Sequence, residues 1–155
     1  MNAHDGPADP GLLARSLALG VASGMRSTLG FNGPGLRGLR KKGLTRANVG
    51  RLTGIGGELV VDKLPQTPSR LTPPGLIGRF ASGAFGGVQL ARRTGAPVKS
   101  CAIAAVVGAA GAAGGAYGGA AWRRWVAGGT NPRPDWQGAV VEDAVALSLT
   151  AAACR

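Results

Sequence analysis

The longest apolar stretch of the chain is SCAIAAVVGAAGAAGGAYGGAAW, residues 100–122, which holds 23 consecutive positions without a charged side chain. A helix of this length extends about 34 Å, enough to cross the ~30 Å hydrocarbon layer of a bilayer. We therefore predict a membrane-spanning helix at 100–122. The alternative is a flexible Gly/Ala-rich linker, although such linkers are rich in Ser and polar residues rather than in Val and Ile.

Three further apolar stretches are shorter and bounded by charged residues: 16–25, 80–91 and 144–154. Each reaches membrane length only if its charged neighbours are included, which is possible because charges near helix ends snorkel or pair. The helices expected on this basis are about 11–29, 74–91 and 137–154.

A fifth segment, GIGGELVVDKL at 54–64, is too short to span a membrane and is followed by Pro65. Further prolines up to Pro74 keep the next stretch extended. We expect a short re-entrant or interfacial helix at 54–64, because irregular backbone at membrane depth needs protein or water around it. A β-strand over ELVV in a small α/β fold is the alternative.

Small residues recur at helical spacing in three of these segments. The glycines expected to pack helices closely are Gly20, Gly24, Gly83, Gly87, Gly108, Gly111, Gly115 and Gly119. The chain of 155 residues contains 28 glycines and only 5% aromatic residues, which suits helix packing in lipid better than a soluble core. The mean hydropathy of +0.11 is low for a multi-pass protein, although the glycines and a basic loop both lower it. We predict an all-α, multi-pass membrane domain over 11–155 after a disordered tail at 1–10.

The net charge of +11 admits nucleic acid or anionic lipid as a partner. Six basic residues and no acid lie in the loop RGLRKKGLTRANVGR, 37–51, which has no aromatic residue for stacking on bases. A cytoplasmic loop that obeys the positive-inside rule explains it better. The N-terminus is then expected outside. If the segments at 54–64 and 74–91 form a hairpin that returns to the same side, Arg92, Arg93 and Lys99 are expected inside as well. Three basic residues flank each end of 100–122, so charge alone does not orient the second half.

Eight charged residues fall in or beside the apolar segments: Arg26, Lys63, Arg70, Arg79, Glu58, Asp62, Glu142 and Asp143. Their four positive and four negative charges balance, whereas the rest of the chain is strongly basic. A buried charge is costly unless paired, so we expect one neutral polar cluster between helices. The cluster either forms a pathway for an ion, a proton or a small anionic solute, or acts as a static ion-pair staple. For Arg26 a snorkelling position at the interface is a further alternative.

Candidate catalytic and metal-binding residues are sparse. Cys101 and Cys154 lie in no metal-ligand spacing, and His4 stands alone. The chain has no Gly-x-Ser-x-Gly motif and no complete dinucleotide or phosphate loop. We therefore expect no metal, no cofactor and no enzymatic activity.

Three quoted motifs carry a family resemblance: GVASGMRST at 20–28, GELVVDKLPQTPSRLTPPGLIGR at 57–79 and VVEDAVA at 140–146. With the Gly/Ala helix between them, residues 11–150 resemble the bacterial membrane proteins grouped as domain of unknown function 4126. The resemblance implies a small multi-pass helical protein of the bacterial inner membrane with no established activity. The basic run at 37–51 is longer than that pattern leads one to expect.

Together these features favour passage of an ion or a small solute through the polar cluster. A homo-oligomer in the lipid bilayer is expected, because so few helices rarely enclose a pathway alone. The competing class is an accessory membrane protein whose cluster only holds helices together. A third class, a soluble basic nucleic-acid binder, requires the apolar segments to fold in water.

Overall fold

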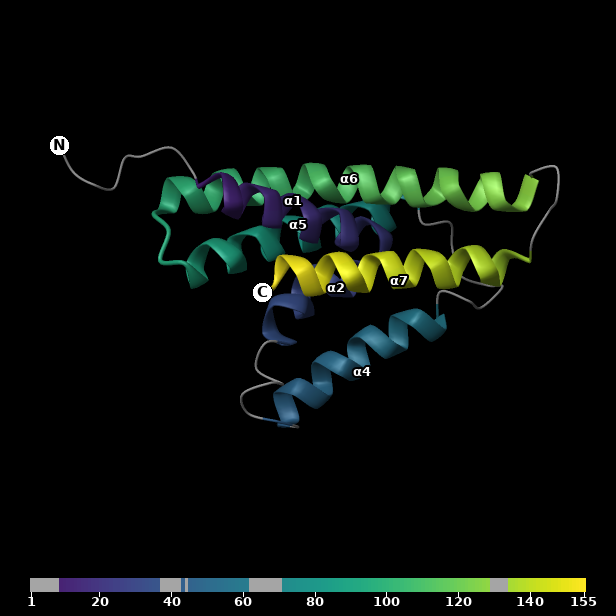
Figure 1. The fold of residues 1–155 in the computed structure, drawn as a ribbon, viewed down its shortest axis with the longest axis horizontal. Helices are drawn as coiled ribbons and strands as arrows, with labels where there is room; N and C mark the ends of the chain where they lie inside the picture. Colours follow the sequence, from purple (N-terminus) through teal and green to yellow (C-terminus); the bar gives the residue numbers. More distant parts are fainter. Residues whose placement is uncertain (1–8, 37–42, 44, 62–70, 129–133) are drawn as a thin grey trace.

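The computed structural model describes residues 9–36, 43, 45–61, 71–128 and 134–155, and the fold over this part of the chain is all-α. The helices are α1 (Pro10–Met25), α2 (Ser27–Asn32), the 3₁₀ turn η1 (Gly33–Leu36), α4 (Arg46–Val61), α5 (Pro73–Arg93), α6 (Val98–Gly128) and α7 (Asp135–Ala153). In Figure 1, α1, α5, α6 and α7 lie alongside one another, and α4 lies apart from them. Because residues 58–61 close α4, the strand alternative for ELVV is wrong.

Three helices match apolar segments of the sequence in place. α5, α6 and α7 have 21, 31 and 19 residues and are therefore about 31, 46 and 28 Å long. By length and composition α6 is the one described helix that could cross a membrane, which is weak support for membrane association. α4 begins at Arg46, well before the expected start at 54, and has 16 residues.

The first helix is not continuous over 11–29 as predicted. α1 begins at Pro10, where the Asp9 carboxylate accepts hydrogen bonds from the backbone N–H groups of Gly11 and Leu12. It ends at Met25, because Arg26 is extended with φ −139° and ψ 107°. A second, six-residue helix α2 starts at Ser27.

The segment after the break runs back beside α1. Side chains of α5 at positions 82, 89 and 93 donate hydrogen bonds to the carbonyls of Ser27, Phe31 and Pro34 in turn. α2 and η1 therefore run parallel to α5. α1 is antiparallel to α5, since Leu12 belongs to the same core cluster as Leu90 whereas Gly24 accepts from Arg79. Residues 10–36 thus form a helical hairpin with its tip at Arg26.

This hairpin changes where the start of α1 lies relative to the other helices. The start of α1 lies at the same end of the molecule as the turn between α5 and α6 (Figure 1), and Arg15 at that end donates a hydrogen bond to the carbonyl of Arg155. The N-terminus was expected opposite Arg92, Arg93 and Lys99. In the described bundle the start of α1 instead lies at the same end as these residues, because the chain turns back at Arg26 and does not continue as one helix over 11–29.

Glycines bring the backbones of α1, α5 and α6 into contact. A Cβ atom added at Gly108 would lie within 3.0 Å of the Gly83 carbonyl, and one at Gly20 or Gly83 equally close to the Gly108 carbonyl. Added Cβ atoms at Gly24, Gly87, Gly111 and Gly115 would likewise come within 3.0 Å of backbone atoms of a neighbouring helix. At Gly119 the nearest atom is a carboxylate oxygen of Glu142.

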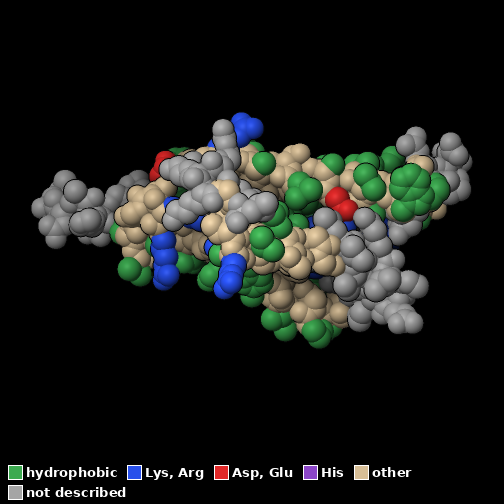
Figure 2. All heavy atoms as spheres, turned by 90° about the horizontal axis from the view of Figure 1, so that it is seen from below, with side chains coloured by type: hydrophobic (Ala, Val, Ile, Leu, Met, Phe, Trp, Pro, Cys, Tyr) green, Lys and Arg blue, Asp and Glu red, His purple; other side chains and the backbone are tan. Residues whose placement is uncertain are grey.

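Large apolar side chains lie mostly on the outside of the bundle. Those exposed on α5, α6 and α7 include Ile77, Phe85, Val98, Val106, Tyr117, Trp125, Trp136, Val140, Val141, Val145 and Leu147. The buried residues comprise leucines such as Leu12, Leu19, Leu29 and Leu90, several alanines, and polar or charged residues, among them Ser16, Ser23, Ser82, Arg26, Arg79 and Glu142. Figure 2 shows the hydrophobic side chains on one face of this surface.

Candidate polar centre at the helix break

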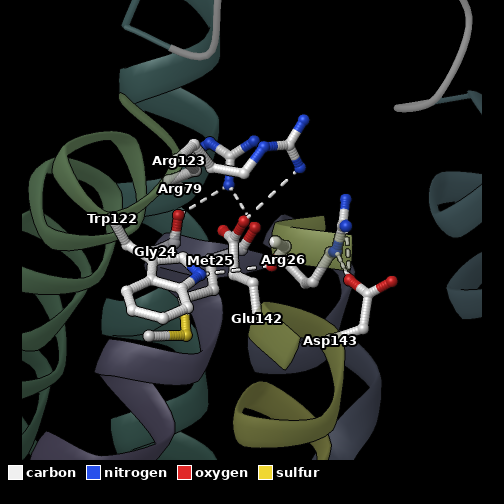
Figure 3. Close-up of polar contacts among 9 residues, drawn as sticks. Gly24, Met25, Arg26, Arg79, Trp122, Arg123, Glu142 and Asp143 are labelled. Carbon is white, nitrogen blue, oxygen red and sulfur yellow. Dashed lines mark hydrogen bonds and ion pairs between the residues drawn. The ribbon is translucent and has the colours of Figure 1, made fainter. Parts of the chain in front are cut away.

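Arg26 forms a buried ion pair at the tip of the hairpin. Its side chain is only 2% exposed, and its Nε donates a hydrogen bond of 2.6 Å to Oδ1 of Asp143 on α7. Its Nη2 forms an ion pair with the same carboxylate oxygen. The extended conformation of Arg26 turns the chain here, and the ion pair ties the turn to α7 (Figure 3).

Arg79 holds the same turn from the opposite side. This residue of α5 is 6% exposed, and its Nη1 donates hydrogen bonds of 2.6 Å to the Gly24 carbonyl and 2.9 Å to the Met25 carbonyl. The last carbonyls of a helix have no partner within it, so a buried helix end needs donors from elsewhere. Arg79 supplies them (Figure 3).

The donors of α5 lie on one face of that helix. Positions 79, 82, 89 and 93 fall within a narrow arc at 100° per residue, and each side chain donates to a carbonyl between residues 24 and 34. Of these four residues, only Arg79 was predicted from the sequence as a site residue. The donors at positions 82, 89 and 93 could have been predicted from the polar face that they form on an otherwise apolar helix.

Glu142 lies one residue from Asp143 and joins a second basic residue. Its side chain is 1% exposed, and its Oε2 is 3.7 Å from Nη1 of Arg123 on α6. The absence of a side chain at Gly119 makes room for the carboxylate. Nearby, Trp122 Nε1 donates a hydrogen bond of 3.2 Å to the Gly138 carbonyl, so a second polar contact joins α6 and α7 one helical turn before Glu142.

The structure brings together four of the eight predicted cluster residues, Arg26, Arg79, Glu142 and Asp143, around the break. Asp62, Lys63 and Arg70 lie outside the described residues, as does the side chain of Glu58. Arg123 was missed as a member because the sequence analysis treated it as a flanking charge of the apolar helix. Its position 19 residues before Glu142 across a short connection was the available signal.

Metal ligands do not gather in the described part of the chain, where no group of three or more His, Cys, Asp or Glu side chains could hold an ion. Both cysteines are free thiols, with Cys154 buried and Cys101 partly buried near the end where α1 begins.

We expect Arg79→Met to lower the free energy of unfolding by about 2–3 kcal/mol, because buried carbonyls of Gly24 and Met25 lose charge-assisted donors. Thermal unfolding of the detergent-purified protein measures the loss. Arg92→Gln, an exposed change on the same helix, is the control and should change the unfolding temperature little. Equal stability of Arg79→Met and wild type would mean that the carbonyls do not depend on Arg79.

Comparisons with models of protein families, with curated proteins and with solved structures found no match to this chain. The resemblance of residues 11–150 to domain of unknown function 4126 therefore stays a prediction.

Proposed function

We propose that this chain is an integral membrane protein of the bacterial inner membrane, related to domain of unknown function 4126. The polar centre at its helix break serves the passage of an ion or a small anionic solute. The protein works as a homo-oligomer in this proposal, since four packed helices leave little room for a pathway within one copy.

Membrane embedding is supported by the distribution of side chains. Large apolar residues such as Ile77, Val106 and Trp125 are more than half exposed, whereas Arg26, Arg79 and Glu142 are buried beside the leucines and alanines of the core. In water this arrangement leaves much apolar area hydrated, which is unfavourable. In lipid the same apolar side chains contact hydrocarbon tails instead of water, which is favourable. The small residues inside the bundle allow the helices to pack closely.

The observation that carries the transport proposal is the Arg26–Asp143 ion pair at a break in a helix, buried inside this apolar exterior. Broken helices in transporters commonly present backbone carbonyls and charged groups to ions and solutes near the middle of the membrane. Ionisable residues at such a depth are expensive, so their presence favours a functional role.

A second candidate, an accessory membrane protein with a static staple, is favoured by a different observation. Nη1 of Arg79 and the hydroxyl of Ser82 already donate to the carbonyls of Gly24, Met25 and Ser27. A staple needs only such fixed contacts, whereas a pathway needs a group that exchanges partners.

Glu142→Gln distinguishes the two candidates because it removes one charge and keeps the shape of the side chain. Purified wild-type and variant proteins are reconstituted in liposomes, and proton and chloride fluxes are measured beside thermal unfolding. A pathway predicts a wild-type flux that the variant loses while it unfolds within a few degrees of wild type. Arg124→Gln, an exposed change on α6, is the control and should conduct like wild type.

Two results would contradict transport. One is the absence of proton and chloride flux from well-folded wild-type protein, together with a large loss of stability in Glu142→Gln, which is the behaviour of a staple. The other is release of the protein from membranes by alkaline carbonate, which would leave a soluble basic protein and return nucleic acid as a partner.

A further inference from the structure

Basic side chains gather at the end of the molecule where α1 begins. They come from four separate elements: Arg15 in α1, Arg92 and Arg93 at the end of α5, Lys99 at the start of α6, and Arg155 after α7. Arg15 donates a hydrogen bond to the Arg155 carbonyl, and residues of the same four elements share one core cluster. On the face drawn in Figure 2, the protruding Lys and Arg side chains lie in the half that contains the N-terminus.

Among the described residues Asp9 is the acid at this end, and its carboxylate accepts the hydrogen bonds that begin α1. The hairpin also leaves the bundle here, because Arg93 donates to the Pro34 carbonyl near the end of η1. η1 (Gly33–Leu36) therefore ends beside the basic end.

The opposite end has a different character. There α6 and α7 carry Trp122, Trp125 and Trp136, all exposed, and the rings of the first two are 5.3 Å apart. Arg123 at that end faces Glu142, and Arg124 is exposed. The two ends thus differ in charge and in aromatic content.

We propose that the basic end is cytoplasmic and contacts anionic phospholipid headgroups, so that the start of α1 and Arg155 lie on the same, cytoplasmic side. The proposal rests on the membrane placement given under Proposed function. Lys and Arg near the ends of membrane helices are retained on the cytoplasmic side, and the anionic lipid of that leaflet attracts them. Residues 10–36 then enter the membrane from the cytoplasm and return to it.

Single cysteines introduced into a Cys101→Ala, Cys154→Ala background test this sidedness with a membrane-impermeant maleimide. Thr94→Cys and Pro10→Cys mark the basic end, and Gly128→Cys marks the other; all three positions are exposed. We expect the first two to react in inverted vesicles and be protected in intact spheroplasts, with the reverse for Gly128→Cys.

If Pro10→Cys and Thr94→Cys were labelled from opposite sides of the membrane, the hairpin would be wrong. If both were labelled from outside, the proposed orientation would be wrong. Equal labelling of one position from both sides would show a mixed orientation and also reject the proposal. Carbonate extraction of the same vesicles is the independent check, because loss of the protein from the pellet refutes membrane placement itself.

The charge argument has its own test in the double variant Arg92→Gln, Lys99→Gln, which leaves Arg93 and its bond to Pro34 in place. The externally labelled fraction of Thr94→Cys should rise several-fold in this background, because the cytoplasmic bias is weakened. Arg124→Gln is the matched control and should not raise it. An unchanged fraction in the double variant would reject the role of these basic residues.

Discussion

Gly108→Ala is expected to lower the free energy of unfolding by about 2–3 kcal/mol, because one added methyl group meets backbone rather than a movable side chain. Its Cβ would lie within 3.0 Å of the Gly83 carbonyl oxygen, and α1 contacts the same position through Gly20. The clash can be relieved only if α5 moves away from α6. This movement weakens the packing of both helices. Unfolding of the detergent-purified protein, followed by circular dichroism against temperature, measures the effect.

The controls for this prediction lie on the same helix. Added Cβ atoms at Gly114 and Gly118 meet nothing within 4 Å. Gly114→Ala and Gly118→Ala should therefore keep or raise stability, by up to about 1 kcal/mol from helix propensity. If Gly108→Ala were as stable as these controls, close contact of the backbones at Gly108 would not contribute to the fold.

Asp143→Asn is expected to lower the free energy of unfolding by about 3–5 kcal/mol, because Arg26 would keep a buried charge without its carboxylate. Asp143 is 13% exposed on its side chain and Arg26 only 2%, so water compensates little for the loss. Thermal unfolding in detergent measures this effect as well.

The double variant Arg26→Met, Asp143→Leu tests whether the loss comes from the charge. Replacing both partners of a buried ion pair by apolar residues is often neutral or stabilising, so this variant should recover most of the lost stability. Ser148→Ala, an exposed change on α7, controls for substitution in that helix. Failure of the double variant to recover would show that the ion pair fixes the shape of the turn at Arg26 as well as its charge.

Much of the all-α fold follows from apolar length and glycine spacing. The segments at 74–91, 100–122 and 137–154 lie within or overlap α5, α6 and α7, since apolar stretches of this length are typical of helices rather than of strands. The glycines at 108, 111, 115 and 119 follow the helical repeat, so their common face could be read before any contact was known.

The break at Arg26 could not be predicted in this way. The motif SGMRST contains no proline, and its residues are all tolerated in a helix, so nothing local requires the turn. What stabilises the extended conformation lies elsewhere, in Arg79 of α5 and Asp143 of α7. Such tertiary contacts are invisible to a pattern confined to one segment.

The candidate site was partly predictable for a related reason. The charged residues that lie within apolar segments include Arg26, Arg79, Glu142 and Asp143. They were expected to lie close together, because burying an unpaired charge costs free energy. Ser82 carried no comparable signal, since a single hydroxyl in a helix commonly bonds to its own preceding turn. Only the position of the hairpin tip beside α5 gives that hydroxyl the Ser27 carbonyl as a partner.

The hairpin of residues 10–36 also has a consequence for biogenesis. It is synthesised before α5, yet the donors for its carbonyls at Gly24, Met25 and Ser27 belong to α5, 54 or 55 residues later. During translation these carbonyls therefore lack their hydrogen-bond donors until α5 has left the ribosome. In the membrane placement proposed above, residues 10–36 are expected to reach their final depth only after α5 has been made, so truncation before Arg79 should leave them at the membrane surface.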